Sequence, residues 1–484
     1  MHNRDSVYIN GEWRAPQVKR FIDVINPATG EIIGRAPDCS DADVDAAVKS
    51  ARFAFDSCTW SARPLAERVV ILGKALSLLE SRLDDIAPLV TREMGCPITF
   101  SKMICSDAVA TGRYFLEEAE RLPLCEVRQG RQLASVVREP VGVVASICAW
   151  NGPFAMAVGK LVPPLAMGCS VIFKPAPETP LDAYFIAEAL AQAGLPRGVF
   201  NLVTGGRDTG RALVTHAGVD KVSFTGSSAA GSEIGAECGR SFKRMQLELG
   251  GKSAAIVAED ADMATTMEGL ATGGFFNSGQ VCAAFSRVLI PRVRYEEFTE
   301  ALCATARSFV IGDPMLPGTT LGPLVSVRQR ERVERYIARG VEEGATLLAG
   351  GRRPPGLDTG AYIEPTVFGD VDNTMTIARE EIFGPVVSVI PYDTLDEAIA
   401  IANDSEYGLH GGVFTSSEEV AYEVVSRIRT GTISVNKFAY NTEAPFGGVK
   451  CSGVGRDTGR EALESYLELK TINITPSMLH FYQA

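Results

Sequence analysis

The sequence is poor in histidine and has no cysteine pair spaced Cys-x-x-Cys. Its four histidines, His2, His216, His410 and His480, are far apart, which disfavours a histidine-based metal site and a Ser-His-Asp triad. The eleven cysteines are scattered and odd in number, which argues against a zinc site and a disulfide scaffold. We therefore expect no metal, free thiols and a reducing compartment, the cytoplasm.

The chain also lacks long apolar runs and an excess of basic residues. The longest apolar run, residues 141–150, is much shorter than the roughly 18 residues of a membrane span and has the length of a buried strand. The start, Met-His-Asn-Arg-Asp-Ser, has no apolar signal-peptide core. Asp and Glu number 59 against 47 Lys and Arg, whereas nucleic-acid binding relies on clustered basic residues. We expect a soluble enzyme with neither a membrane nor a nucleic acid as partner.

The 484 residues suffice for two or three domains. Turn signals predict a β-rich start over residues 1–40, apolar residues at helical spacing predict helices over 41–120, and residues 121–138 have the pattern of an extended arm. Strands and helices then alternate, which indicates βαβ units on a parallel sheet. We predict strands at 141–148, 170–174, 199–203 and 221–224, and helices at 155–165, 181–192 and 229–238.

A second alternating series begins at residue 253 and indicates a second α/β domain. We predict its strands at 253–258, 288–291 and 386–391, and its helices at 263–276, 295–309, 328–343 and 395–403. The tail, residues 467–482, alternates like a strand. Because a lone terminal strand is not stable by itself, we expect it to join a sheet in another subunit.

One cysteine stands in an unusual setting. Cys282 follows the polar, glycine-containing stretch Asn-Ser-Gly-Gln (277–280), which is typical of a loop end rather than a core strand. A buried structural cysteine is the ordinary alternative for any single cysteine. A thiol of ordinary pKa, about 8.5, still suits attack on a carbonyl carbon. The local pattern therefore favours Cys282 as a nucleophile.

Two polar residues upstream could complete a carbonyl chemistry. Glu248 stands between two leucines, so it is either the solvent-facing member of an alternating strand, which the pattern alone favours, or a buried acid whose raised pKa suits a general base. Asn151 follows a strand and precedes a helix, where asparagine is most often a helix N-cap. Its amide could instead stabilise an oxyanion, an effect of about 3 kcal/mol.

Several loops could hold phosphates, although none matches a P-loop or the usual Gly-x-Gly-x-x-Gly fingerprint. Residues 224–231 end a strand and open a helix, as a phosphate site at a helix N-terminus requires. Gly205 and Gly210 show the same spacing as Gly226 and Gly231. Tight strand–helix connections explain both loops equally well. Lys174 ends a strand, the position where open α/β sheets bind ligands.

These segments together resemble the aldehyde dehydrogenase superfamily over nearly the whole chain. The most specific motifs are Leu-Glu-Leu-Gly-Gly-Lys (247–252), Phe-Asn-Ser-Gly-Gln-Val-Cys (276–282), Glu-Glu-Ile-Phe-Gly-Pro-Val (380–386) and Pro-Phe-Gly-Gly-Val-Lys-Cys-Ser-Gly (445–453). The resemblance implies an α/β fold with an atypical Rossmann-type cofactor domain, an α/β catalytic domain and a small β oligomerisation arm. It also implies NAD as cofactor, with NADP possible, and a homodimer or homotetramer.

The expected domains follow from this resemblance. Residues 1–120 and 139–249 would form the dinucleotide-binding domain and residues 250–450 the catalytic domain. Residues 121–138 and 467–484 would form the oligomerisation arm and tail.

The resemblance also implies roles for single residues. Cys282 would add to the aldehyde, Asn151 and the Cys282 backbone N–H would hold the oxyanion, Glu248 would activate water, and Lys160 would lie near the proton-exit path. The aldehyde would become a carboxylic acid through a thiohemiacetal and a thioester. The cofactor would be held by Lys174 at the adenosine ribose, Ser227 at the pyrophosphate, Glu381 and Phe383 at the nicotinamide half, and the glycines Gly205, Gly226 and Gly250.

The chain departs from the commoner family pattern at two places. Pro177 stands where a glutamate usually binds the adenosine ribose, with Glu178 displaced by one, so NAD preference is less strict. Gly152 and Gly159 stand where relatives often have aromatic residues, which predicts a wide substrate tunnel for medium or long apolar aldehydes, aliphatic, terpenoid or aryl. The other expected lining residues are Ala155, Met156, Phe276, Val281, Phe285, Tyr440 and Phe446.

Two alternatives remain open on the sequence. A relative that passes the thioester to coenzyme A usually lacks the glutamate base, so Glu248 weighs against this reaction. A non-catalytic binding protein on the same fold is the other alternative, because fold alone does not give function. The joint presence of Cys282, Glu248 and Asn151 weighs against it.

Overall fold

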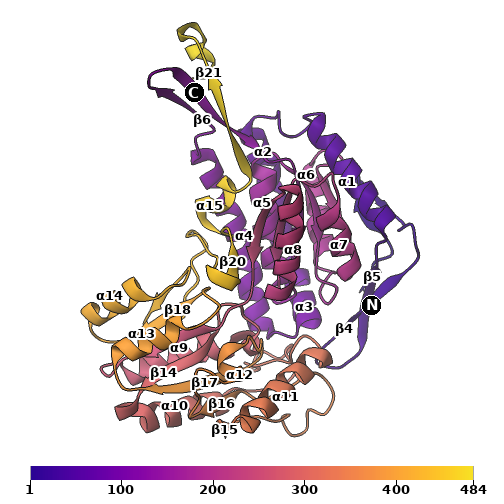
Figure 1. The fold of residues 1–484 in the computed structure, drawn as a ribbon. Coiled ribbons are helices and arrows are strands. Elements are labelled where there is room, and N and C mark those ends of the chain that lie inside the picture. The colour runs from indigo at the N-terminus through magenta and orange to yellow at the C-terminus, as the bar shows by residue number, and fades with distance from the viewer. Residues whose placement is uncertain (1, 483–484) are drawn as a thin grey trace.

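The computed structural model describes residues 2–482 and places them in four β-sheets surrounded by helices (Figure 1). The N-terminal segment forms a small three-stranded sheet of order β1-β5-β4 at the side of the molecule. Its strands are β1 His2–Asn3, β4 Phe21–Ile25 and β5 Ile32–Pro37. Among the described residues, no helix combines the length and the apolar character needed to cross a bilayer.

The first large sheet has eight strands in the order β20-β12-β11-β8-β9-β10-β2-β3. Its strands are β2 Val7–Ile9, β3 Glu12–Arg14, β8 Val143–Ile147, β9 Ser170–Lys174, β10 Phe200–Leu202, β11 Lys221–Thr225, β12 Arg244–Glu248 and β20 Gly453–Val454. The strands from β8 to β12 pair in parallel. The strand order reverses between β8 and β11, and open α/β sheets bind ligands at the carboxyl ends of the strands at such a point.

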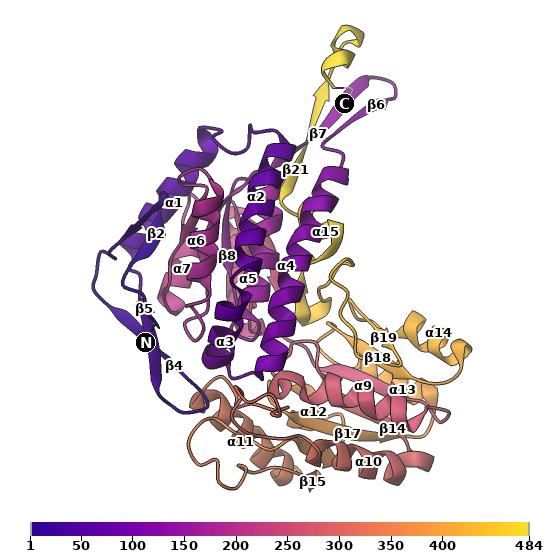
Figure 2. The same cartoon turned by 180° about the vertical axis from the view of Figure 1, so that it is seen from behind.

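Helices cover both faces of this sheet, and Figures 1 and 2 show the two faces in turn. They are α1 Asp41–Asp56, α2 Leu65–Glu80, α3 Leu83–Met94, α4 Ile98–Arg121, α5 Pro153–Ala166, α6 Ala183–Ala193, α7 Arg207–Thr215 and α8 Ser228–Ser241. The helices α2 to α6 pack on one face, and α1, α7 and α8 contribute to the apolar cluster on the other. This is the covering that a parallel sheet needs, since both of its faces are apolar.

The second large sheet has seven strands in the order β15-β16-β17-β14-β13-β18-β19, all parallel except β15. The strands are β13 Ser253–Val257, β14 Phe285–Pro291, β15 Thr346–Ala349, β16 Thr366–Gly369, β17 Val386–Tyr392, β18 Gly411–Phe414 and β19 Ser434–Val435. Its helices are α9 Met263–Phe275, α10 Tyr295–Arg307, α11 Val327–Glu342, α12 Thr376–Arg379, α13 Leu395–Asn403 and α14 Glu418–Arg427. The predicted second alternating series is therefore confirmed, while the proposed domain boundaries stay a prediction.

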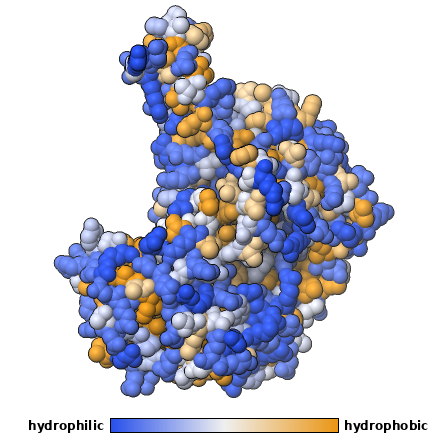
Figure 3. Space-filling model, in the orientation of Figure 1, coloured by the Kyte–Doolittle hydropathy of each residue, from blue (hydrophilic) through white to orange (hydrophobic). Residues whose placement is uncertain are grey.

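A three-stranded arm projects from the body in Figures 1 and 2. It consists of β6 Cys125–Gln129, β7 Leu133–Pro140 and β21 Leu467–Asn473, in the order β21-β7-β6. The strand β21 pairs antiparallel with β7 of its own chain from Leu467 to Asn473, so it is not a lone strand, and the expectation that the tail joins a sheet in another subunit stays a prediction. The last residues of the predicted tail, 483–484, lie outside the described residues. Figure 3 shows hydrophobic residues on the arm among hydrophilic ones.

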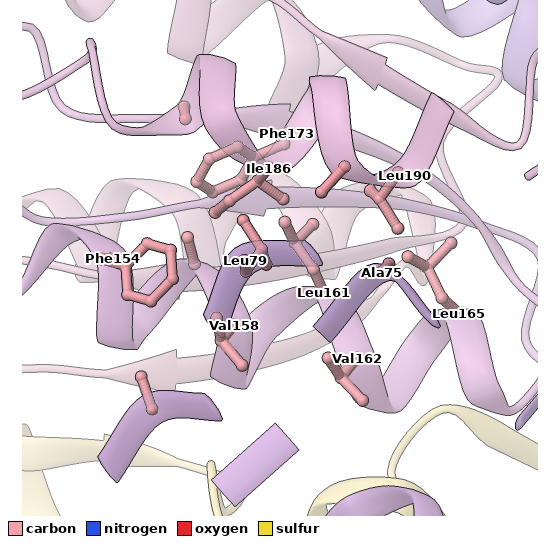
Figure 4. Packing of buried hydrophobic residues seen from close by; sticks show 14 of the residues in the cluster. Ala75, Leu79, Phe154, Val158, Leu161, Val162, Leu165, Phe173, Ile186 and Leu190 are labelled. Atoms are coloured by element: carbon pink, nitrogen blue, oxygen red, sulfur yellow. The ribbon is translucent and has the colours of Figure 1, made fainter. Parts of the chain in front are cut away.

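The helix α5 shows how the sequence produces the core. It begins with a proline, Pro153, whose missing N–H costs nothing in the first turn of a helix. Apolar residues then recur at helical spacing and are buried. Replacing one buried leucine of this layer with alanine would cost about 2–5 kcal/mol. Figure 4 shows the layer, formed by Ala75 and Leu79 of α2, Phe154, Val158, Leu161, Val162 and Leu165 of α5, Phe173 of β9, and Ile186 and Leu190 of α6.

Candidate active site

The candidate residues meet where the two large sheets face each other. Asn151, Lys174, Ser227 and Glu248 lie at or just after the carboxyl ends of β8, β9, β11 and β12. Parallel strands bring these four ends to one edge of the first sheet. Cys282 precedes β14 at the amino edge of the second sheet. Only four residues of chain separate the end of β12 from the start of β13, which holds the two edges together.

The loop that carries Cys282 turns sharply after α9. Asn277, Ser278 and Gly279 adopt left-handed backbone conformations, with φ of 50°, 55° and 69°. A Cβ atom at Gly279 would collide with the backbone of Gly384, so the turn requires glycine there. Ser278 Oγ donates a hydrogen bond to Gly322 O at 2.7 Å. The predicted loop end is thus a tightly held turn that presents the thiol at the junction.

Glu248 is a buried carboxylate without a hydrogen-bond partner. Its side chain is only 5% exposed, and neither carboxylate oxygen has a partner among the described residues. Burial, and then the neighbouring charge of Asp457, raise the pKa of this carboxyl well above its ordinary value. The solvent-facing alternative is therefore wrong, because Glu248 is buried and this end of β12 pairs with β20 instead of forming the edge of the sheet. An unpartnered buried carboxylate is free to accept a proton.

Cys282 lies beside this carboxylate. Burial, and then the negative charge of Glu248, raise the pKa of the thiol well above its ordinary value. The resting sulfur is therefore protonated at neutral pH. A nucleophile of this kind needs a base next to it, and Glu248 has this position.

The amide of Asn151 points toward the nucleophile loop. The N-cap of α5 is Gly152, so the simple N-cap alternative for Asn151 is wrong. Asn151 Nδ2 donates to Gln280 O at 2.9 Å, and Asn277 Nδ2 donates back to Asn151 O at 3.1 Å. A primary amide has two N–H groups, so one remains for a ligand.

Lys160 lies in a saturated polar network rather than beside Cys282. Its side chain is 2% exposed, and Nζ donates to both oxygens of Asp457 at 3.0 and 2.9 Å and to Ser223 Oγ at 3.2 Å. Asp457 also accepts hydrogen bonds from Gln246 and Thr225. Asp457 contributes to the raised pKa of Glu248, so this network acts electrostatically on the candidate base.

The candidate ribose site lies at the end of β9. Lys174 is 4% exposed, and Nζ donates to Pro175 O at 3.2 Å. Burial lowers the pKa of this lysine to about 8. Pro177 offers no side-chain hydrogen bond, and the displaced Glu178 pairs with Arg328 at 2.9 Å instead. No carboxylate therefore stands at position 177 to meet a ribose hydroxyl.

The loops around β11 and β12 have the shape that a dinucleotide needs. Ser227 caps α8 by accepting a hydrogen bond from Ala230 N at 3.3 Å, which leaves a helix N-terminus for a phosphate. A Cβ atom at Gly226 would collide with Phe224, and one at Gly205 with Thr209, so both turns require glycine. These residues and the buried Lys174 fit the phosphates and the adenosine ribose.

The nicotinamide candidates lie at the amino edge of the second sheet. Glu381 Oε1 accepts a hydrogen bond from Gly251 N at 3.0 Å, and burial raises the pKa of Glu381 to about 7. A Cβ atom at Gly250 would collide with this carboxylate, so the cradle exists only with glycine. Phe383 has a left-handed φ of 61° and packs edge-on against Trp150, with ring centroids 5.2 Å apart. Gly251, Glu381 and Phe383 line one small cavity together with Val281, the neighbour of Cys282, and a nicotinamide is expected on this side.

The expected substrate lining divides into a pocket wall and one core residue. Phe285 is fully buried at the start of β14, where its ring packs against His410, Phe414 and Phe438. Its assignment to the pocket is therefore wrong, because a strand position facing α9 and β18 cannot contact a substrate. The other expected lining residues are partly accessible or lie next to Cys282, namely Gly152, Ala155, Met156, Gly159, Phe276, Val281, Tyr440 and Phe446.

Open space lies beside Gly159. A Cβ atom there would meet no atom within 4 Å, and one at Gly152 would meet only Met156 Cε, at 3.5 Å. Phe276 packs edge-on against Phe100 of α4, with centroids 3.9 Å apart. This side of α5 therefore has room for a larger side chain at Gly159, while the width of a substrate tunnel stays a prediction.

Four residues of the site escaped the sequence analysis: Phe100, Asp457, Gln280 and Ser452. Ser452 Oγ donates to Gly250 O at 2.7 Å and accepts from Gly408 N at 3.0 Å, which fixes the glycine cradle. Asp457 lies more than 200 residues from Lys160, Thr225 and Gln246, and Ser452 lies 202 residues from Gly250, so the local sequence does not show these contacts. Gln280 was visible only as part of the polar loop before Cys282.

Comparisons with known proteins agree with this fold. The aldehyde dehydrogenase family model matches residues 13–472. The chain is 45% identical to an aldehyde dehydrogenase of Mycobacterium tuberculosis whose structure was solved in complex with NAD+, with a TM-score of 0.96 and 98% of each chain covered. It is 40% identical to a mutant of aldehyde dehydrogenase C from Pseudomonas syringae solved with NAD+ and octanal, with a TM-score of 0.93, covering 98% of this chain and 97% of that one. The fold is that of the aldehyde dehydrogenases, and both of these relatives were solved with NAD+.

Characterised relatives support the same class. The chain is 41% identical to geranial dehydrogenase of Castellaniella defragrans, over 96% of this chain and 98% of the relative. It is also 41% identical to 3-succinoylsemialdehyde-pyridine dehydrogenase of a Pseudomonas species, over 98% and 99%. The chain belongs to the aldehyde dehydrogenase family.

Proposed function

We propose that this chain oxidises apolar aldehydes to carboxylic acids through a covalent bond to Cys282. The observation that carries the proposal is the buried, unpartnered carboxylate of Glu248 beside the thiol. Leaving such a group without a partner costs stability, so its position calls for a function. The carboxylate of Glu248 would accept a proton twice in one cycle, first from the thiol of Cys282 and, after losing that proton, from a water molecule.

The first half of the reaction forms a bond between Cys282 Sγ and the aldehyde carbon. As Sγ attacks, Glu248 takes the thiol proton, and the carbonyl oxygen becomes an oxyanion held by Asn151 Nδ2 and the Cys282 N–H. Donors of this kind are worth about 3 kcal/mol each in the transition state. A bound NAD, for which Lys174, Ser227 and Glu381 are the candidate binding residues, would supply the hydride acceptor for this step. A thioester remains on Cys282.

The second half releases the acid. Glu248 loses its first proton and then takes a proton from a water molecule, which attacks the thioester carbon while Sγ leaves. The charge of Asp457, which is paired with Lys160, raises the pKa of Glu248. We place the path by which the proton of Glu248 leaves the site along this pair, on the side of the first sheet. Because Glu248 supplies a base for water, transfer of the acyl group to coenzyme A is not required.

Two variants of equal size test the nucleophile. Cys282→Ala should abolish aldehyde oxidation, whereas Cys303→Ala, at a buried cysteine of α10 away from the site, should leave it unchanged. Mass spectrometry of the wild type quenched during turnover should find acyl mass on the peptide that contains Cys282. Full activity in Cys282→Ala, or no acyl adduct at that thiol, would contradict the mechanism.

The lining residues favour an apolar substrate. The wall beside Cys282 consists of aliphatic and aromatic side chains and glycines, with no arginine among the expected positions. A second carboxylate on the substrate would be left unpaired there, which costs several kcal/mol. The structure solved with octanal and the relative named geranial dehydrogenase support the same class, although the relative named for a pyridine semialdehyde is equally similar.

A substrate panel tests the width of the tunnel. We expect octanal, citral and benzaldehyde to give a higher kcat/KM than succinic semialdehyde. Gly159→Trp should fill the open space and reduce kcat/KM for citral and benzaldehyde by about tenfold or more, while acetaldehyde changes little. Gly239→Ala, on the exposed face of α8 where a Cβ also meets no atom within 4 Å, is the control. Preference for succinic semialdehyde would refute the assignment.

The missing carboxylate at position 177 supports tolerance of NADP beside NAD. A ribose-binding acid normally repels a 2′-phosphate, and Glu178 is held away by Arg328. Pro177→Glu should therefore lower the affinity for NADPH relative to NADH in fluorescence titrations without aldehyde. An unchanged ratio would show that position 177 does not face the 2′ position.

Two further properties complete the proposal. We place the chain in a reducing compartment, the cytoplasm, because all eleven cysteines are free thiols. We also propose a homodimer or homotetramer formed through the arm, where Leu469 of β21 is 68% exposed. Light scattering of the wild type and of Leu469→Asp would show whether a charge on the arm reduces the oligomer.

A further inference from the structure

We propose that Gln280 is a positioning residue that aims the amide of Asn151 and holds the nucleophile loop in its reactive shape. The inference rests on the proposed function of Cys282 and Asn151, which it deepens. Gln280 itself touches neither the thiol nor the space above it, so it would act through its neighbours.

The side chain of Gln280 forms a buried bridge. It is 0% exposed, Oε1 accepts a hydrogen bond from Val325 N at 2.9 Å, and Nε2 donates to Asn277 O at 3.1 Å. Both ends of the amide therefore bind backbone groups. Removing the amide would leave the N–H of Val325 unpaired, at a cost of about 1–3 kcal/mol, and would take from Asn277 O one of its two hydrogen bonds.

The bridge connects the loop to the segment 322–325, which precedes α11 in the part of the chain that contains the second large sheet. Leu324 and Val325 are buried, and Leu324 N donates to Ala361 O at 2.9 Å. Ser278 Oγ makes a second connection, to Gly322 O at 2.7 Å, and Gly322 packs so closely on Gly95 that a Cβ atom would collide there. The segment 322–325 therefore serves as a rigid support for the nucleophile loop.

The loop needs such a support because its backbone is strained. Asn277 and Ser278 have φ of 50° and 55°, and a non-glycine residue in this region costs roughly 1–2 kcal/mol. Strained residues persist only where their surroundings fix them. The hydrogen bond from Gln280 Nε2 to Asn277 O, together with that from Gln280 N to Asn277 O at 3.1 Å, fixes the strained pair.

The carbonyl of Gln280 in turn orients the oxyanion donor. Gln280 O accepts from Asn151 Nδ2 at 2.9 Å and from Asn277 Nδ2 at 3.2 Å. Because a carbonyl oxygen can only accept, it forces Asn151 to present its nitrogen rather than its oxygen to the junction. The amide is planar, so binding one N–H fixes the direction of the other. An oxyanion donor loses its effect when its direction is lost.

The main variant is Gln280→Ala. We expect kcat for octanal oxidation to fall about 100-fold, the order found when an oxyanion donor is lost. KM should change less than about threefold, since the pocket wall is untouched. Asn201→Ala is the matched control, because the Asn201 amide, also 0% exposed, accepts from Asn10 N at 3.0 Å and donates to Gly198 O at 2.8 Å on β10. It should lose a similar amount of stability without loss of kcat.

The conservative variant Gln280→Glu gives a pH readout. A protonated glutamic acid can accept from Val325 N and donate to Asn277 O, as glutamine does, whereas the carboxylate can only accept. Burial keeps the pKa of such a carboxyl above its ordinary value, so kcat should be rescued at low pH and lost as pH rises. The kcat ratio of Gln280→Glu to wild type should therefore fall with pH; a ratio independent of pH would contradict the bridge.

A double-mutant cycle with Asn151→Ala separates positioning from general damage. If Gln280 acts through the Asn151 amide, the double variant should be no more than about threefold slower than Asn151→Ala alone. Losses that multiply would show that Gln280 acts elsewhere. Cys282→Ala separates the failure of the proposed function from the failure of the role of Gln280. If Cys282→Ala stays active, the proposed function is wrong. If Cys282→Ala is inactive and Gln280→Ala is fully active, only the role of Gln280 is wrong.

Discussion

Two carboxylates near the junction have opposite surroundings. Asp457 accepts hydrogen bonds from Lys160, Gln246 and Thr225, so its charge is paired with that of Lys160 and its oxygens are occupied. Glu248, at the end of the neighbouring strand, is more deeply buried and has no hydrogen-bond partner among the described residues. The first arrangement supports the structure, and the second keeps a group ready to react.

This contrast shows that a group needed for the reaction is kept in a state that lowers the stability of the fold. A buried polar group is normally paired, since the loss of water must be compensated. The paired group contributes a fixed geometry, whereas the unpaired one gains a raised pKa and room for a proton. Removing the unpaired group should therefore reduce activity more than stability, whereas breaking the paired group should reduce stability more than activity.

The largest effect is expected for Glu248→Gln. The variant keeps the shape but cannot accept a proton, so kcat should fall by about 10²–10⁴-fold. Steady-state NADH formation with octanal measures the loss. Glu268→Gln, on the exposed face of α9, is the control and should retain full activity. A Glu248→Gln enzyme that turns over normally would remove the base from the mechanism.

The next effect concerns the paired carboxylate. Lys160→Met leaves Asp457 without its counter-charge, and breaking such a buried pair costs about 3 kcal/mol. Urea denaturation should show this loss of stability, with Lys160→Arg less affected than Lys160→Met. If Lys160→Met were as stable as the wild type, the distinction between the two carboxylates would not hold.

The pH dependence of stability should sharpen the contrast. The folded-state pKa of Glu248 is raised, so the folded protein holds a proton that the unfolded chain releases, and stability falls as pH rises from the ordinary carboxyl pKa to the raised one. Glu248→Gln lacks this loss and should be more stable than the wild type by about 1 kcal/mol at pH 8, a usual gain when a functional group is removed. The gain should disappear toward pH 4. Thermal melts from pH 4 to pH 8 measure this difference in stability. If Glu248 were paired, the wild type would instead become more stable than Glu248→Gln as the pH rises.

The smallest effect is expected for Thr225→Val. Thr225 Oγ1 supplies one of the several hydrogen bonds to Asp457, at 3.5 Å, so its removal should cost no more than about 1 kcal/mol. The activity should not change measurably. A loss as large as that of Lys160→Met would show that the network depends on every member rather than on the ion pair.

Much of the architecture was readable in the sequence. The strand predicted over 170–174 and the helix over 395–403 are confirmed at both ends. These elements follow local rules: strands that are buried on both faces are continuously apolar, and helices repeat every 3.6 residues. The helix predicted over 181–192 begins at Ala183 instead, because Asp182 is its N-cap.

The errors share a physical cause. The alternation of residues 246–249 resembles a half-exposed strand, yet Glu248 is buried and β20, from the C-terminal part of the chain, pairs with its strand. Phe285 follows the Cys282 loop closely, yet it begins a strand and faces the core. The tail strand, taken to be a lone strand, has its partner β7 more than 300 residues earlier in the same chain. In each case a distant segment decides what the local pattern leaves open.

The sequence by itself determined the repeating α/β pattern, the loop that presents Cys282 and the motifs that place the chain in its family. These depend on residues close together in the chain. Only the tertiary structure decided which polar groups are paired and which are left free. Burial and hydrogen-bond partners depend on the full three-dimensional neighbourhood: Glu248 is free and Asp457 is paired because segments more than 200 residues apart meet there.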